Sequence, residues 1–246
     1  MNIKNKYFKI ATVLFFAASS SFVSAQKKQT AKPNILFIAV DDLKPLLGCY
    51  GNTLVKSPNI DRLAKMATVF NSNYCQQAVC GPTRASLMTG LRPDLTQVWD
   101  LKTPMRDVNP DILSLPQYFL SQGYSTQGIG KVYDPRNVDK NLDGPSWSVP
   151  YYKTDAKYYA KATGEPALGL YQSPATKQLV NQYLIEAKAK GLGKKDADDE
   201  ALSKVKLSSE SADVPDNAYN DGANTLQAKD ILSQLSKTEK PFFFAV

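Results

Sequence analysis

Asn34-Ile-Leu-Phe-Ile-Ala-Val40 is the stretch that decides the fold, and it runs directly into Asp41-Asp42. Its apolar, partly β-branched residues are typical of a strand that is buried on both faces. Strands of this kind occur in parallel sheets that helices cover on either side. The stretch therefore predicts an α/β fold, with two carboxylates at the carboxyl end of its first strand.

The rest of the chain alternates between strand and helix patterns. Ser114 and Gln117 form a capping-box pattern, while Gly90 and Gly123 stand where helices commonly end. This alternation predicts a mainly parallel sheet flanked by helices. The predicted strands are 34–40, 124–130 and 241–246, the predicted helices are 58–67, 82–89, 115–122 and 223–236, and residues 68–75 are predicted to be extended.

Residues 1–25 have the pattern of a secretory signal peptide. Three lysines precede an apolar run at 10–18, and Val23 and Ala25 are placed like the small residues of a cleavage site. A transmembrane anchor is the alternative, but the run is far shorter than the ~20 apolar residues that span a bilayer. We therefore expect an exported protein, periplasmic or secreted, without stable membrane insertion.

The mature chain divides into two parts. Residues 26–32 form a polar lead-in, and the folded domain extends over 33–246. Within it, the stretch 151–214 is rich in Tyr and Lys and carries a dense charge run, so we expect a variable surface insertion with one or two helices. The chain ends on an apolar strand, and we expect it to be the N-terminal part of a longer catalytic domain whose sheet is incomplete.

Composition excludes several classes of function. The chain has 246 residues with 30 Lys+Arg against 23 Asp+Glu, and this net charge of +7 is too small and dispersed to indicate a nucleic-acid partner. Three cysteines are too few for a disulfide scaffold. The chain contains no histidine, which excludes a Ser-His-Asp triad, a histidine zinc site and a histidine base within it.

Cys80-Gly-Pro-Thr-Arg84 is the first candidate for chemistry. Cys80 stands just before the predicted helix, where free backbone N–H groups favour an anion, and Arg84 adds a cation one turn later. A thiol there is placed as an activated nucleophile would be. The alternatives are a small buried cysteine and an ordinary surface arginine.

Asp41, Asp42 and Lys131 all follow the predicted strands at their carboxyl ends, where ligand sites of open α/β sheets lie. Adjacent carboxylates repel each other unless a cation neutralises them, and oxygen ligands suit Ca²⁺ or Mg²⁺. A turn or helix cap is the alternative for the two acids, and a surface lysine is the alternative for Lys131. Together the groups predict a site that binds a metal and an anion.

The motif at Cys80 resembles the Cys-X-Pro-[Ser/Thr]-Arg signature of the type I sulfatases, which share the alkaline-phosphatase-like α/β fold. The order and spacing of Pro33–Asp42, Ser57–Asp61 and Gly130-Lys131 agree with that family. The stretches 41–51 and 76–80 resemble its iduronate-2-sulfatase branch. The resemblance extends from about residue 32 to the end of the chain and is weakest over 151–214.

The resemblance implies a sulfuric ester hydrolase that removes sulfate from a sulfated sugar of the glycosaminoglycan type, such as a uronate 2-O-sulfate. A separate formylglycine-generating maturation enzyme would oxidise Cys80 to formylglycine, whose hydrated aldehyde is the nucleophile. Asp41, Asp42 and the group at position 80 would bind Ca²⁺. Arg84 would hold the hydrated formylglycine, and Lys131 would contact a sulfate oxygen.

Two departures from the family pattern stand out. Asp134 occupies the position of the histidine in the family's Lys-X-X-His, where a carboxylate would repel sulfate unless it is protonated or metal-bound. The family's later Lys-Pro-His segment and its remaining metal ligands are absent from these 246 residues, so we expect no turnover from residues 26–246 alone.

These departures leave alternatives open. The main one is a truncated or degenerate sulfatase-like protein that binds sulfated glycans without turnover. A metal-dependent phosphoester hydrolase is a further alternative, against which Cys80 argues because that class mostly uses Thr or Ser. Cys49 and Cys75 have no implied role beyond packing or a loose pair.

Overall fold

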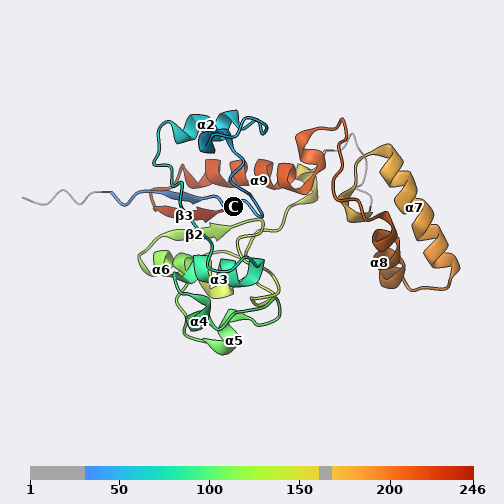
Figure 1. The fold of residues 1–246 in the computed structure, drawn as a ribbon. Coiled ribbons are helices and arrows are strands. Elements are labelled where there is room, and N and C mark those ends of the chain that lie inside the picture. The colour runs from blue at the N-terminus through green and yellow to red at the C-terminus, as the bar shows by residue number, and fades with distance from the viewer. Residues whose placement is uncertain (1–30, 161–167) are drawn as a thin grey trace, which may run out of the picture. The chain divides into compact units, whose positions relative to one another are not determined.

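The computed structural model describes residues 31–160 and 168–246, so the predicted signal peptide and most of the polar lead-in lie outside them. Figure 1 shows how the elements are arranged. The strands are β1 (Ile35–Phe37), β2 (Ser125–Gly128) and β3 (Phe242–Ala245). The α-helices are α2 (Pro58–Ala64), α3 (Cys80–Thr89), α4 (Pro93–Thr96), α5 (Met105–Val108), α6 (Leu115–Ser121), α7 (Pro174–Ala189), α8 (Lys194–Val205) and α9 (Asn220–Leu235). Short 3₁₀ turns are η1 (Gly48–Tyr50), η2 (Gly144–Ser146), η3 (Ala156–Tyr158), η5 (Leu168–Leu170) and η6 (Asp216–Ala218).

The sheet has the order β1-β3-β2, and both strand pairs are parallel. β3 comes last in the sequence yet lies in the middle, where Phe243 pairs with Ile35 on one side and with Thr126 on the other. The predicted α/β fold with a mainly parallel sheet is therefore confirmed. Parallel strands place their carboxyl ends at one edge, which brings the residues after β1 and β2 together.

The two faces of β3 carry the core, because successive side chains of a strand point to opposite faces. Phe243 and Ala245 pack in a cluster with α3 residues such as Met88. Phe242 and Phe244 pack against α9 on the other face. Figure 1 accordingly shows α9 on one side of the sheet and α3 with α6 on the other.

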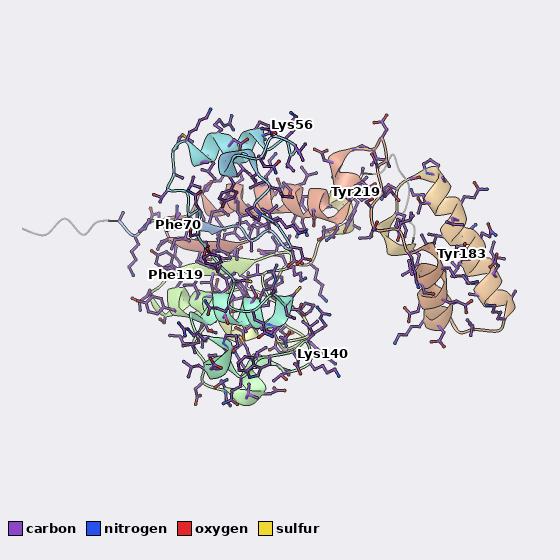
Figure 2. All side chains as sticks on the ribbon, in the orientation of Figure 1. Lys56, Phe70, Phe119, Lys140, Tyr183 and Tyr219 are labelled. Carbon is purple, nitrogen blue, oxygen red and sulfur yellow. The ribbon has the colours of Figure 1, made fainter. Side chains whose placement is uncertain are left out.

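An aromatic contact and a helix cap fix α6 on its face of the sheet. The ring of Phe119, labelled in Figure 2, stacks on Phe243 with centroids 5.0 Å apart and an interplanar angle of 17°. At the start of the helix, the Ser114 hydroxyl accepts the backbone N–H of Gln117 while the Gln117 side chain accepts that of Ser114. The capping box predicted from the sequence is therefore confirmed.

The first strand differs from its prediction. β1 is shorter than 34–40, and its outer positions Leu36, Ile38 and Val40 are 45%, 64% and 57% exposed rather than buried. Leu36 lies beside Phe244 in the sheet, but the cluster that α9 forms with β3 contains no β1 residue among those described. The prediction of burial on both faces is therefore wrong for β1, because α9 covers β3 and leaves this part of the sheet open.

Other boundaries also shifted. Residues 68–75 form no strand, and Phe70 within them is 69% exposed (Figure 2). Helix α3 begins at Cys80, two residues before the predicted start at Pro82. A proline favours the first turn of a helix but does not determine which residue begins it. The prediction therefore placed the start of α3 too late.

The stretch 151–214 contains the two helices α7 and α8, which lie side by side (Figure 1). Small residues such as Ala187 and Ala201 are fully buried, and Lys204 pairs with Glu186 at 3.2 Å across the two helices. Most of the charged residues of α8 point to solvent. Within the described ranges, every helix is too short or too polar to cross a membrane.

We predict that Phe244→Ala lowers the free energy of unfolding of this chain by about 3–5 kcal/mol, because a fully buried ring is lost from the central strand. Leu36→Ala is the matched control at the neighbouring position on the same face, and it should cost less than about 1 kcal/mol. Urea unfolding followed by circular dichroism measures both. Equal losses of unfolding free energy in the two variants would contradict the conclusion that α9 covers β3 and leaves β1 open.

Candidate active site

The predicted site residues meet at the carboxyl edge of the sheet. Asp41 and Asp42 follow β1, Lys131 follows β2, and Cys80 begins α3. A carboxylate oxygen of Asp41, one of Asp42 and the Cys80 sulfur all lie within 4.8 Å of one another. Segments about forty and ninety residues apart in sequence are therefore assembled at the edge where ligand sites of α/β sheets form.

Asp41 is the centre of this arrangement. Its Oδ1 lies 2.6 Å from Nη2 of Arg84, and its Oδ2 lies 2.5 Å from Nζ of Lys131. Burial raises the pKa of the Asp41 carboxyl, but hydrogen bonds from Lys131 and Arg84 outweigh burial and set it below its ordinary value of 3.8. Asp41 is therefore a stable anion between two cations.

Arg84 is only 5% exposed, and its guanidinium is directed inward. Its Nη1 donates to the backbone carbonyl oxygens of Lys131 and Val132, the second at 3.0 Å. Because Nη2 also binds Asp41, this one side chain joins α3 to β1 and to the loop after β2. Its implied contact with hydrated formylglycine stays a prediction.

Lys131 points at the thiol. Its Nζ lies 3.6 Å from Sγ of Cys80 and donates to Asp41. The hydrogen bond to Asp41 raises the pKa of the Lys131 ammonium, so the side chain remains a cation. The Tyr151 hydroxyl donates to the carbonyl of Gly130 at 3.0 Å and accepts the N–H of Val132 at 3.4 Å, which holds the backbone on both sides of Lys131.

The close approach of Asn137 favours glycine at the position after Cys80. A Cβ at Gly81 would lie 1.8 Å from Oδ1 of Asn137 and 3.0 Å from the carbonyl oxygen of Asp100. The Asn137 amide is held in place because it donates to the carbonyls of Asp100 and Thr103 at 3.0 and 2.8 Å. Asn137 thus packs against the first turn of α3 and fixes the position of Cys80.

Asp134 does not present the bare charge that its position suggested. Its side chain is buried and pairs with Arg136, with Nη2 2.8 Å from Oδ2. Hydrogen bonds from Arg136 lower the pKa of Asp134 and prevail over burial, so the carboxylate is ionised and balanced. The sequence did not predict this partner, a guanidinium two residues away that balances the charge of the acid.

The donor atoms fit a hard cation only in part. Asp41 and Asp42 offer carboxylate oxygens, which suit Ca²⁺, whereas the Cys80 sulfur is a soft ligand that does not. Each carboxylate oxygen has two lone pairs, so Asp41 can accept from its two cations and still bind a metal. A complete Ca²⁺ site at these residues therefore requires an oxygen at position 80.

Sequence reasoning missed three residues of the site: Arg136, Asn137 and Tyr151. All of them come from the segment after β2, and no periodicity marks them. The closest signal was the pair Asp134-Pro-Arg136, in which opposite charges are separated by a proline. Cys49 and Cys75 are free thiols, so they do not form the loose pair suggested from the sequence.

Comparisons with known proteins point in one direction. The Sulfatase family profile matches residues 33–246. Iduronate 2-sulfatases of Mus musculus and Homo sapiens are each 35% identical over 215 residues, which is 87% of this chain and 34% of theirs. A Formosa agariphila protein named Sulfatase is 38% identical over 149 residues, which is 57% of this chain and 29% of that protein.

A solved structure also aligns. The crystal structure of Ps i-CgsB in complex with k-i-k-neocarrahexaose has a TM-score of 0.54 and 25% identity, with 87% of this chain and 44% of that chain covered. The chain thus spans about a third of the length of the two iduronate 2-sulfatases it matches.

We predict that Gly81→Ala lowers the free energy of unfolding by about 1–3 kcal/mol, because the added methyl group overlaps Asn137. Gly144→Ala is the matched control, since a Cβ there makes only ordinary contacts at 3.6 Å or more, and it should change stability by less than about 0.5 kcal/mol. Asn137→Ala added to Gly81→Ala should cost less than the sum of the single changes. Additive losses would contradict the contact.

Proposed function

The chain belongs to the sulfatase family, and from that premise we propose that it carries the nucleophile and part of the metal site of a sulfuric ester hydrolase. The observation that carries the proposal is the meeting of Asp41, Asp42, Cys80 and Lys131 at one edge of the sheet. The proposed substrate is a sulfated sugar of the glycosaminoglycan type, such as a uronate 2-O-sulfate, which the 35% identity to iduronate 2-sulfatases supports.

The proposed chemistry needs two further components, a maturation enzyme that acts on Cys80 and a Ca²⁺ ion. A formylglycine-generating maturation enzyme would convert Cys80 to formylglycine, whose hydrated aldehyde supplies the nucleophile and the oxygen that the donor set requires. Ca²⁺ held by Asp41, Asp42 and that oxygen would polarise the sulfuryl group and offset its developing charge. The predicted signal peptide supports export to the periplasm or medium.

The chain's own residues have distinct tasks in this reaction. Lys131 binds a sulfate oxygen, since its ammonium lies beside position 80 and stays protonated. Asp41 fixes that ammonium through the hydrogen bond between Oδ2 and Nζ. Arg84 holds the hydrated formylglycine in this proposal, and from its buried place it also positions Asp41 and the Lys131 backbone.

A second candidate function is glycan binding without turnover, in a truncated or degenerate sulfatase-like protein. The absence of histidine from all 246 residues favours it, since no imidazole of this chain can protonate the leaving sugar oxygen. The retained cysteine signature and carboxylate pair favour the enzyme.

The first test is the chemical state of Cys80. With a formylglycine-generating enzyme co-expressed, we expect the tryptic peptide that contains Cys80 to lose mass as thiol becomes aldehyde and to react with a hydrazide probe. Cys75, an exposed free thiol on the same tryptic peptide, is the internal control. Fragment-ion masses should place the change at position 80 and leave Cys75 unmodified. A thiol at position 80 under these conditions would count against the proposal.

Sulfate release from 4-nitrocatechol sulfate and from sulfated uronate disaccharides then separates the two candidate functions. The protein as its gene encodes it should hydrolyse these esters, and Cys80→Ala should abolish turnover while glycan binding persists. A modified protein that binds the disaccharides without releasing sulfate would favour the second function.

A further inference from the structure

The pair formed by Asp134 and Arg136 has the geometry of a fixed anion receptor. Nε of Arg136 donates to Oδ1 of Asp134 at 2.9 Å, and Nη2 donates to Oδ2 at 2.8 Å. The backbone N–H of Arg136 also donates to Oδ1, at 3.0 Å. Two parallel bonds of this kind hold the guanidinium plane in one orientation.

Burial of the two partners is unequal. The Asp134 side chain is 0% exposed, whereas the Arg136 side chain is 52% exposed. A guanidinium has five N–H donors, and the bonds to Asp134 use only two of them. Within the described ranges, no hydrogen-bond partner occupies Nη1 of Arg136. The inner edge of the guanidinium is therefore anchored, and its outer edge faces solvent with donors available.

This outer edge belongs to the neighbourhood of the candidate active site. Asp134 comes three residues after Lys131, and Arg136 directly precedes Asn137, whose side chain packs against Gly81 beside Cys80. Electrostatics agrees with this placement. The charge of Lys131 contributes to the lowered pKa of Asp134, and the pKa of Arg136, raised chiefly by Asp134, is raised further by Cys80.

Ion pairing alone does not explain why a buried acid stands here. A pair with one exposed partner adds little to stability, because solvent screens it, and a buried carboxylate costs free energy to desolvate. Pre-orienting the guanidinium gives the pair a use, since an arginine that is already fixed loses little rotamer freedom when it binds an anion.

We propose that Asp134 positions Arg136 so that its outer N–H groups bind an oxyanion of the substrate, in place of the histidine that the family pattern has at position 134. The shared chemistry is a negatively charged oxygen, which either the sulfuryl group or a sugar carboxylate can supply. The inference rests on the proposed function, because it assigns a further contact to the same substrate.

Steady-state kinetics tests the assignment. The protein is expressed from its whole gene, with Cys80 converted to formylglycine. We expect Arg136→Gln to raise KM by about 10–100-fold with a smaller change in kcat, as lost hydrogen bonds to a charged group do. The KM of Arg136→Lys should lie between those of the parent and of Arg136→Gln. Lysine keeps the positive charge but lacks the paired N–H donors of the guanidinium. Lys157→Gln is the matched control, since Lys157 is an exposed cation that also pairs with an acid two residues before it.

Two substrates distinguish the source of the oxyanion. A rise in KM for both 4-nitrocatechol sulfate and a sulfated uronate disaccharide assigns Arg136 to the sulfuryl group. A rise for the disaccharide alone assigns it to the carboxylate. Unchanged KM values for both, together with unchanged inhibition by inorganic sulfate, would overturn the inference while the turnover itself upholds the proposed function.

Arg136→Gln could also raise KM by destabilising the fold, and a second variant separates this effect from the loss of a substrate contact. Arg136→Gln alone leaves the buried Asp134 carboxylate without its partner, whereas Asp134→Asn combined with Arg136→Gln removes both charges. The double variant should keep the melting temperature close to that of the parent and still show the raised KM. If no turnover occurs in the parent, calorimetric titration of inorganic sulfate and of the sulfated uronate disaccharide into the same proteins decides the inference. Equal affinities of parent and variants for both ligands overturn it.

Discussion

The carboxylate of Asp41 is the interaction on which the rest of the site depends. It binds Arg84 from α3 and Lys131 from the loop after β2, so three distant segments converge on one side chain at the end of β1. Without it, the buried guanidinium of Arg84 would lose its counter-charge, a loss that commonly costs several kcal/mol. Lys131 would also lose the contact that directs its ammonium toward Cys80.

The sheet makes this convergence possible. β3 lies between β1 and β2 with both partners parallel, so Asp41 and Lys131 emerge at the same edge. The two faces of β3 are sealed by different helices, and Phe243 and Phe244 are almost completely buried as a result. A rigid central strand therefore sets the distance between the groups that flank it, and α3 adds Cys80 from one side.

Much of this could be predicted from local pattern. Apolar runs located β1 and β3, and the Ser114 capping box located α6, because these features depend on neighbours in sequence. The strand β2 (Ser125–Gly128) has no apolar run, and its place was predicted from the alternation of helix and strand. The exposed face of β1 could not be predicted, since its cover depends on where α9 packs. The roles of Arg136 and Asn137 were also hidden, because loop residues acquire their partners only through the tertiary fold.

The central proposal is that Asp41 both anchors the site and would help to bind Ca²⁺, whereas Asp42 would only bind the ion. Thermal unfolding with and without Ca²⁺ tests this directly. The protein is expressed from its whole gene, with Cys80 converted to formylglycine. We predict that Ca²⁺ raises the melting temperature of the parent and of the control Asp155→Asn, and that Asp42→Asn loses only this shift. Asp41→Asn should lose the shift and also melt lower without Ca²⁺. An undiminished Ca²⁺ shift in both Asp41→Asn and Asp42→Asn would contradict the account.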